Sequence, residues 1–207
     1  VDANTGYGVS FKIPLTVKEP SVTLEDIEAK LFSEVIWEYS TTFNTGQVGR
    51  SKNIALASNK INGTILAPDE IFSYNDVVGE RSYSEGFQEA TVYMNGESVP
   101  GVGGGICQPS STLYAAALYA NLEIVERHNH SLPVSYLPAG LDATIAEGYL
   151  DLRIRNNTEF PVKISATTDG GIVKFTIYGF NKDNISVDVQ RSFSGGIYYV
   201  TRVVKQD

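Results

Sequence analysis

Residues 162–178, which read VKISATTDGGIVKFTIY, decide the fold class. Apolar and polar side chains alternate over 162–166 and again over 172–178, which is the period of half-buried β-strands. The Asp169-Gly170-Gly171 triplet between them is a turn sequence, so the two strands are predicted to form a hairpin. Residues 149–155 alternate in the same way just upstream. The C-terminal half is therefore predicted to be an antiparallel β-meander.

The first half of the chain shows helical periodicity instead. Apolar residues recur every three or four positions over 24–38 and 51–61, and a third helix is predicted over 108–121. Asn95-Gly96 suits the two-residue turn of a hairpin over 91–99. Because helices come first and strands later, we predict an α+β fold in which a helix-rich N-terminal half packs on a mostly antiparallel β-sheet.

Three segments are expected along the chain. Residues 1–47 hold a predicted strand over 9–17 and the first helix, residues 48–185 form the main domain, and residues 186–207 form a C-terminal β extension. Because the chain does not begin with methionine, we expect any export signal or membrane anchor to lie outside it.

Composition limits the classes of partner. The chain has 207 residues, 42% of them hydrophobic, which is enough to bury a full core. Its 24 acidic and 16 basic residues give a formal net charge of −8, whereas nucleic-acid binders carry a basic surface, so no nucleic-acid partner is expected. No apolar run is long enough to span a bilayer, and no membrane contact is expected for these residues. We expect a monomer without a cofactor or a metal.

Cys107 is the single cysteine, and it stands between three glycines, Gly103-Gly104-Gly105, and the predicted helix over 108–121. The free N–H groups and the positive dipole at a helix start favour a thiolate. Glycines permit positive φ or close backbone approach, which a nucleophile turn requires. Backbone N–H groups from Gly105 to Cys107 would then bind an oxyanion, each well-placed donor contributing about 3 kcal/mol. The alternative is a small buried cysteine that only packs.

The two histidines, His128 and His130, are the candidate bases. A base must lie within hydrogen-bond reach of the sulfur and must be oriented by a third group. Candidates for that group are the side chains of Asp142, Glu147 and Ser131, or else a backbone carbonyl. A zinc site is the rival interpretation, with Cys107 or Asp142 as the third ligand. The simplest alternative is a pair of surface or structural histidines.

Five motifs of this sequence, taken in order, resemble the VanW family, which is named for a protein of some bacterial vancomycin-resistance clusters. They lie at residues 62–75, 103–108, 126–131, 140–144 and 151–158. The resemblance covers about residues 48–180. It also implies that the segment before this domain ends a peptidoglycan-binding region and that the C-terminal tail begins a further module.

The resemblance implies a protein at the extracellular face of a bacterial cell, in the cell wall, whose partners are peptidoglycan stem peptides. Some family members are described as cysteine L,D-transpeptidases. By this resemblance, Cys107 would attack the carbonyl of the third residue of a tetrapeptide stem and expel D-alanine. The resulting thioester would pass to the side-chain amine of a second stem and make a 3–3 cross-link. His130, or else His128, would be the base, and we favour His130 because it lies deeper in the turn after Arg127.

Six residues are expected to line the substrate site, namely Gly104, Gly105, Ser110, Ser111, Arg127 and Asp142. Arg127 suits bidentate binding of a stem carboxylate, or else a structural ion pair. The serines also suit capping of the helix that follows Cys107. Two other functions stay open. One is a non-catalytic peptidoglycan-binding or scaffolding module, and the other is a cysteine amidase or carboxypeptidase that acts on the same substrate.

Overall fold

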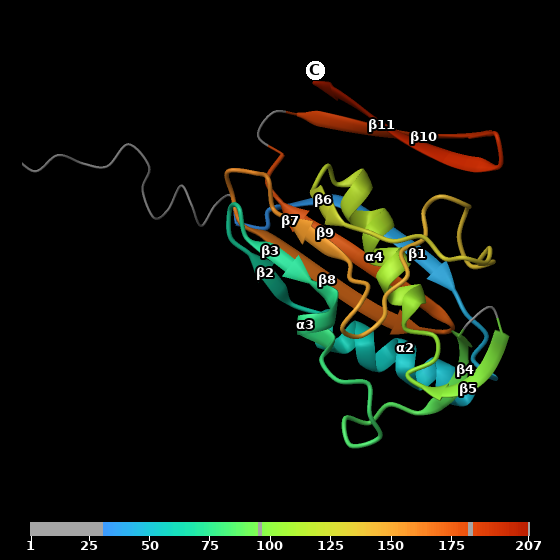
Figure 1. Ribbon diagram of the computed structural model, residues 1–207. Coiled ribbons are helices and arrows are strands. Elements are labelled where there is room, and N and C mark those ends of the chain that lie inside the picture. The colour runs from blue at the N-terminus through green and yellow to red at the C-terminus, as the bar shows by residue number, and fades with distance from the viewer. Residues whose placement is uncertain (1–30, 95–96, 182–183, 207) are drawn as a thin grey trace, which may run out of the picture.

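The computed structural model describes residues 31–94, 97–181 and 184–206 (Figure 1). The predicted strand over 9–17 and residues 24–30 of the predicted helix over 24–38 lie outside these residues. The described helices and strands are, in chain order, β1 (Glu34–Thr42), α2 (Val48–Ile61), β2 (Thr64–Leu66), β3 (Ile71–Ser73), α3 (Tyr74–Val78), β4 (Glu89–Met94), β5 (Glu97–Val102), α4 (Cys107–Tyr119), β6 (Glu123–Glu126), β7 (Arg153–Arg155), β8 (Val162–Asp169), β9 (Ile172–Gly179), β10 (Ile185–Ser194) and β11 (Ile197–Gln206).

The largest sheet has four antiparallel strands in the order β1-β9-β8-β2. Strands β8 and β9 form the predicted hairpin, in which Ile164 lies opposite Ile177. Both of these side chains are fully buried. The neighbouring positions face the other way, and Lys174 there forms an ion pair with Glu38 of β1. The alternation in the sequence therefore separates a core face from a polar face.

Helices α2 and α4 cover the core face of this sheet. Both contact β9, and they also contact each other. Helix α2 contributes Ile54 and Ile61 and α4 contributes Leu113 and Ala116, all fully buried in one cluster with the sheet. Burying a large aliphatic side chain contributes about 1.5–3 kcal/mol, so this interface fixes the position of both helices. None of the described helices is both long and apolar enough to cross a bilayer.

The α+β class is confirmed, but the N-terminal half is not helix-rich. Among its described residues, α2 and the short α3 stand beside five strands, β1 to β5. Residues 34–38, the end of the predicted helix over 24–38, belong to β1. Val35, Ile36 and Trp37 are β-branched or aromatic and favour a strand, and pairing with β9 satisfies the backbone of this segment. These two effects outweigh the helical spacing of its apolar residues.

Two smaller sheets position the loops of the site. Strands β3, β7 and β6 form one antiparallel sheet in that order, and β4 and β5 form the second as the predicted hairpin. Of the predicted strand over 149–155, only β7 forms. Asp151 accepts hydrogen bonds from the Ser73 hydroxyl at 2.6 Å and from the Asn75 N–H at 2.9 Å. The segment before β7 is therefore used to hold the start of α3.

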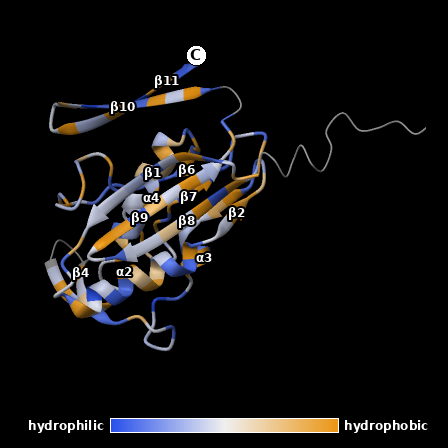
Figure 2. Cartoon of the chain, turned by 180° about the vertical axis from the view of Figure 1, so that it is seen from behind, coloured by the Kyte–Doolittle hydropathy of each residue, from blue (hydrophilic) through white to orange (hydrophobic). Residues whose placement is uncertain are grey.

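The C-terminal hairpin of β10 and β11 forms a separate two-stranded sheet (Figure 1). Hydrophobic and hydrophilic segments alternate along it in Figure 2. Arg202 Nη1 donates a hydrogen bond to the Leu122 carbonyl at 2.7 Å, and Val200 lies close against Gly140. The hairpin therefore rests on the segment that follows α4 and on the loop that leads to Asp142.

Candidate active site

Cys107 is the first residue of α4, and its side chain is partly exposed. Two of the glycines before it have positive φ, 82° at Gly103 and 101° at Gly105. The third, Gly104, lies so close to β4 that a Cβ atom there would be 2.6 Å from the Thr91 carbonyl oxygen. The glycine run therefore forms a turn that larger residues could not adopt without strain, and this turn presents the thiol at the helix start.

Two fully buried side chains hold this turn from outside. The Tyr74 hydroxyl donates to the Ile106 carbonyl at 2.9 Å. The Asn53 amide donates to the Gly104 carbonyl at 3.0 Å and to the Gln88 carbonyl at 2.8 Å, and it accepts the Gln88 N–H at 2.7 Å. Neither residue could be singled out from the sequence, because each contact joins distant parts of the chain. The one available signal was a polar Asn53 beside the apolar face of a predicted helix.

The Cys107 sulfur faces the segment that follows Asp142. Sγ lies 3.7 Å from Thr144 Oγ1 and 3.7 Å from the Ile145 carbonyl oxygen. Within the described residues, no backbone hydrogen bond uses the N–H of Cys107 itself. This N–H is one of the donors that the first turn of a helix leaves unpaired, and such a donor beside a nucleophile suits a developing oxyanion.

Asp142 orients the His130 ring. The Nδ1 atom and the backbone N–H of His130 both bond to Asp142 Oδ2, at 2.8 and 2.6 Å. Arg127 Nη2 donates to Asp142 Oδ1 at 2.9 Å, and its Nε donates to the Asp142 carbonyl at 2.6 Å. The side chains of His130 and Cys107 also interact, and with Nδ1 engaged by Asp142 the Nε2 atom is the ring nitrogen left for the sulfur. Cys107, His130 and Asp142 therefore form a thiol–imidazole–carboxylate series.

The charges of the three groups support one another. Burial raises the pKa of the Cys107 thiol, but hydrogen bonding to His130 lowers it, and the result is a pKa below that of an ordinary thiol. Burial lowers the pKa of His130, but hydrogen bonds to Asp142 and Cys107 outweigh burial and raise it to about 9. Burial raises the pKa of Asp142, but hydrogen bonds from His130 and the charge of Arg127 bring it below its usual value. The lowered pKa of the thiol and the raised pKa of the imidazole favour a thiolate beside an imidazolium.

His128 takes a different position from His130. Its Nε2 atom lies 2.9 Å from Glu126 Oε1, and its side chain is 38% exposed. Its backbone carbonyl accepts the Thr144 N–H at 2.8 Å, which ties the end of β6 to the segment near the sulfur. The structure thus brings His130, and not His128, to the thiol. The role of His130 as the base stays a prediction that this geometry favours.

Ser110 and Ser111 are fully buried. Ser111 Oγ donates to the Cys107 carbonyl at 2.7 Å and accepts the Ala143 N–H at 2.9 Å, so it ties α4 to the strand segment beside Asp142. In this arrangement neither hydroxyl is exposed to a substrate. The expected capping by these serines is wrong, because Ile106 occupies the N-cap of α4 and the first helical turn has no side-chain cap.

Arg127 and Glu147 are engaged within the protein. Besides its bonds to Asp142, Arg127 donates to the Gly140 carbonyl at 3.3 Å and lies 5.3 Å from the centre of the Tyr114 ring. The structure therefore shows the ion-pair alternative for Arg127. Glu147 accepts the Arg81 N–H at 3.3 Å and is not the group that orients His130.

The histidines turn to different carboxylates, His128 to Glu126 and His130 to Asp142. The zinc interpretation requires both imidazoles on one centre. Across residues 31–94, 97–181 and 184–206, no cluster of three or more histidine, cysteine or acidic side chains has an arrangement that could hold a metal ion.

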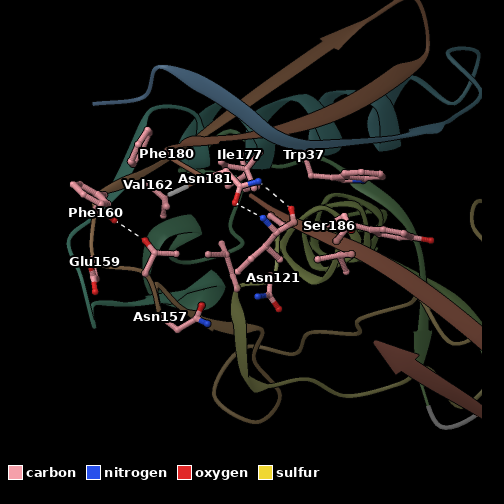
Figure 3. Close-up of a pocket in the computed structure, with 17 residues that line it drawn as sticks. Trp37, Asn121, Asn157, Glu159, Phe160, Val162, Ile177, Phe180, Asn181 and Ser186 are labelled. Atoms are coloured by element: carbon pink, nitrogen blue, oxygen red, sulfur yellow. Dashed lines mark hydrogen bonds between the residues drawn. The ribbon is translucent and has the colours of Figure 1, made fainter. Parts of the chain in front are cut away.

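A groove of about 680 Å³ is lined by Gln108 and Tyr136, close to the start of α4. Another cavity, of about 440 Å³, lies between β1, the end of α4 and β10 (Figure 3). Trp37 forms part of its wall and stacks on Tyr119, with 5.0 Å between the ring centroids. None of the residues around the sulfur lines that second cavity, whereas the groove is lined by Gln108, which follows Cys107 in α4, and by Tyr136, whose hydroxyl donates to the Cys107 carbonyl.

Comparison with known proteins places this site within a described family. The family model for VanW like protein matches residues 49–178. The chain is 40% identical over 174 residues to a protein of Bacillus subtilis (strain 168) named "Uncharacterized protein YoaR", which covers 84% of this chain and 57% of the relative. It is 30% identical over 177 residues to "Vancomycin B-type resistance protein VanW" of Enterococcus faecalis (strain ATCC 700802 / V583), which covers 77% of this chain and 64% of the relative.

The chain spans less than two thirds of the length of both relatives. No solved structure matches it. The family match contains Cys107, His130 and Asp142 together with the glycine turn that presents the thiol. The chain belongs to the VanW-like protein family.

Proposed function

We propose that this protein is a peptidoglycan L,D-transpeptidase of the bacterial cell wall that uses Cys107 as its nucleophile. The observation that carries the proposal is the series of a partly exposed thiol, an imidazole and a carboxylate at the start of α4. A cysteine that only packs needs none of these partners. The peptidoglycan substrate follows from the family resemblance, and it agrees with a relative that is named for vancomycin resistance.

In the first half of the reaction, the Cys107 thiolate attacks the carbonyl carbon of the third residue of a tetrapeptide stem. A C–S bond forms, and the oxyanion accepts a hydrogen bond from the Cys107 N–H. The C–N bond to D-alanine then breaks, and His130, which enters this step as the imidazolium, gives its proton to the departing amine. Asp142 holds the ring in place and stabilises its positive charge.

In the second half, the neutral side-chain amine of another stem attacks the thioester. A C–N bond forms, the neutral His130 accepts the proton that the amine loses, and Cys107 leaves as a thiolate. The enzyme thereby returns to its starting charges, with a 3–3 cross-link as the product. If water attacks instead, the same residues release a tripeptide stem, which is the carboxypeptidase alternative.

Product analysis tests the proposal. The purified chain is incubated with disaccharide-tetrapeptide, and the products are separated and identified by mass spectrometry. We expect free D-alanine and a cross-linked dimer from the wild type and neither from Cys107→Ala. Equal amounts of dimer with both proteins would exclude Cys107 as the nucleophile, and a tripeptide without dimer would identify a hydrolase.

The two histidines provide a matched pair of variants for the same assay. His130→Gln is expected to lower the rate by about 10²–10⁴-fold, which is the range of general acid–base catalysis. His128→Gln is expected to stay close to wild type, because that ring is bonded to Glu126. A larger loss with His128→Gln would show that the base has been assigned to the wrong residue.

A further inference from the structure

We propose that the groove beside the thiol is a binding site for a carboxylate of the stem peptide and that Arg50 is the residue that recognises it. This inference rests on the proposed function, because it gives the chemical class of the acyl donor. It adds a specificity-determining residue to a site in which Arg127 is already committed to Asp142.

The groove has the position that a donor peptide requires. Three segments form its walls, namely the chain around the start of α2, strand β4 from Glu89 to Thr91, and the loop over 133–136. Gln108 and Tyr136 lie at the end nearest the nucleophile, and the Tyr136 hydroxyl donates to the Cys107 carbonyl at 3.3 Å. One end of an extended peptide in this groove would therefore lie beside the start of α4, which carries Cys107.

Arg50 is held at this end of the groove by a series of hydrogen bonds. Its Nη2 atom donates to Gln108 Oε1 at 2.5 Å. The Gln108 amide group donates in turn to Thr41 Oγ1 and to the Thr42 carbonyl, both at 2.9 Å, and Gln108 is only 1% exposed. The amide therefore cannot turn, and it fixes the guanidinium against Gln108, the residue that follows the nucleophile in α4.

The glycine turn brings the stem of Arg50 still closer to the thiol. A Cβ atom at Gly105 would be 2.6 Å from Arg50 Cγ, so the arginine side chain runs directly along the turn. The pKa of the Tyr136 hydroxyl also reflects the charges of both Cys107 and Arg50. Burial and the negative charge at Cys107 raise the pKa of this hydroxyl, whereas the positive charge of Arg50 opposes the increase. Arg50, Tyr136 and Cys107 thus share one electrostatic environment.

The charge of the groove selects the class of ligand. Among the described residues that line it, Arg50 is the only lysine or arginine, and Glu89 is the only acid. A planar guanidinium at a fixed position matches a carboxylate, because the two groups can form two parallel hydrogen bonds. In a protein of net charge −8, one such cation beside the nucleophile is well placed to bring an anionic donor to the site.

A tetrapeptide stem can supply this carboxylate from two places. One is the free α-carboxylate that a γ-linked glutamyl residue carries just before the third residue, and the other is the C-terminal carboxylate of D-alanine. The test therefore uses three synthetic donors, the unmodified stem, the stem amidated at the second residue and the stem amidated at its C-terminus.

Binding is measured by isothermal titration calorimetry with Cys107→Ala and with Cys107→Ala combined with Arg50→Gln, so that no turnover occurs. We expect Arg50→Gln to weaken binding of the unmodified donor by about ten- to a hundredfold. One of the two amidated donors is expected to bind the Cys107→Ala protein more weakly by the same factor. Adding Arg50→Gln is expected to weaken the binding of that donor no further. That donor identifies the carboxylate that Arg50 contacts. Equal losses on all three donors, or no loss on any, would overturn the proposal.

Turnover of the same donors, with Cys107 present, separates the two proposals. If the wild type cross-links the stems but Arg50→Gln has no donor-dependent effect, the carboxylate site is wrong and the transpeptidase stands. If Arg50 governs binding but no donor reacts, the transpeptidase is wrong and the site stands.

Arg191→Gln, which removes an exposed guanidinium on β10, is the matched control and is expected to bind all donors as the parent does. The alkylation rate of Cys107 in Arg50→Gln and Arg50→Lys reports whether the site remains intact.

Discussion

The Cys107 sulfur owes its charge chiefly to the neighbouring His130 ring. Burial alone would keep the thiol protonated, whereas interactions with His130, the Ile145 carbonyl and Thr144 together bring its pKa below the ordinary value. His130 in turn has a pKa of about 9 because Asp142 and the sulfur hold its proton. Thiolate and imidazolium therefore coexist between the lowered pKa of Cys107 and about pH 9. Acyl transfer is expected to be fastest within this window and to fall on either side.

The pH dependence of alkylation tests this charge state. We expect the rate of Cys107 alkylation by iodoacetamide to reach half its maximum below pH ~8.5, the pKa of an ordinary thiol. His130→Gln removes the hydrogen bond and leaves burial as the main effect, so its midpoint is expected above that of the wild type. The rates are followed by mass spectrometry of the intact protein. A wild-type midpoint at or above that of a free thiol would contradict the thiolate.

Asp142→Asn tests the orienting group. The variant removes the negative charge beside both His130 and Arg127, so the pKa of His130 should fall and an uncompensated guanidinium remains. We expect a loss of activity of about 10²–10⁴-fold. We also expect a loss of stability of about 1–3 kcal/mol. The histidine titration is read by NMR and the stability by urea unfolding. An unchanged His130 titration would show that Asp142 does not hold the ring.

Single-residue patterns named Cys107 as the candidate nucleophile and named both histidines and Asp142 as candidate partners, but they could not show which of these the fold brings together. The one cysteine after three glycines was visible in the sequence, and so was the pair of histidines. The choice between His130 and His128 depends on the fold of the loop up to Asp142, because residues two positions apart face the same way only in an extended segment. Gln108 and Arg50 were not singled out at all, since their contacts join segments 58 residues apart.

Among the elements, the glycine turn, α2 and β4 act as one support for the thiol. Asn53 of α2 bonds to both the turn and the segment before β4. Gly104 lies directly against β4, where a Cβ atom would be 2.7 Å from the Ala90 carbonyl carbon. The position of Cys107 is therefore fixed by packing of three elements and not by α4 alone.

Asn53→Ala tests this support. The substitution leaves the buried Gln88 N–H and the Gly104 carbonyl without their partner, which is expected to cost about 1–3 kcal/mol. The free energy of unfolding is measured in urea. Lys52→Ala, an exposed neighbour on the same helix, should change it by less than about 0.5 kcal/mol. Equal effects of the two substitutions would mean that Asn53 does not support the turn.

Helices and strands were predicted correctly where the spacing of apolar residues in the sequence agrees with the packing and strand pairing of the folded chain. Helices α2 and α4, the β8–β9 hairpin and the β4–β5 hairpin were all predicted close to their observed bounds. Strand β1 was missed because its apolar residues also fit a helical spacing, and only pairing with β9 decides for a strand. The predicted strand over 149–155 was too long because Asp151 bonds to the start of α3.

For the whole molecule, the C-terminal hairpin stands apart from the core that carries the site. Strands β10 and β11 pair with each other, while Arg202 and Val200 connect the hairpin to the loops below it. The large sheet, α2 and α4 bury their own cluster of apolar side chains. The hairpin therefore adds stability to a domain that already has its core.

Truncation after residue 184 tests this division. The shortened chain is expected to fold, with a melting temperature lower by a few degrees, because it loses the contacts at Leu122 and Gly140. The pH midpoint of Cys107 alkylation should not change. Melting is followed by circular dichroism. A chain that fails to fold, or a shifted alkylation midpoint, would show that the hairpin is part of the catalytic unit.

The most direct measurement of the central claim is the mass of the protein during turnover. The wild type is mixed with a tetrapeptide donor in the absence of an acceptor, quenched in acid and analysed intact. We predict an added mass equal to the donor minus alanine, located on Cys107 by digestion, released by neutral hydroxylamine and absent from Cys107→Ala. An adduct that persists in Cys107→Ala, or a cross-linked product that forms without any adduct on Cys107, would contradict acyl transfer through this thiol.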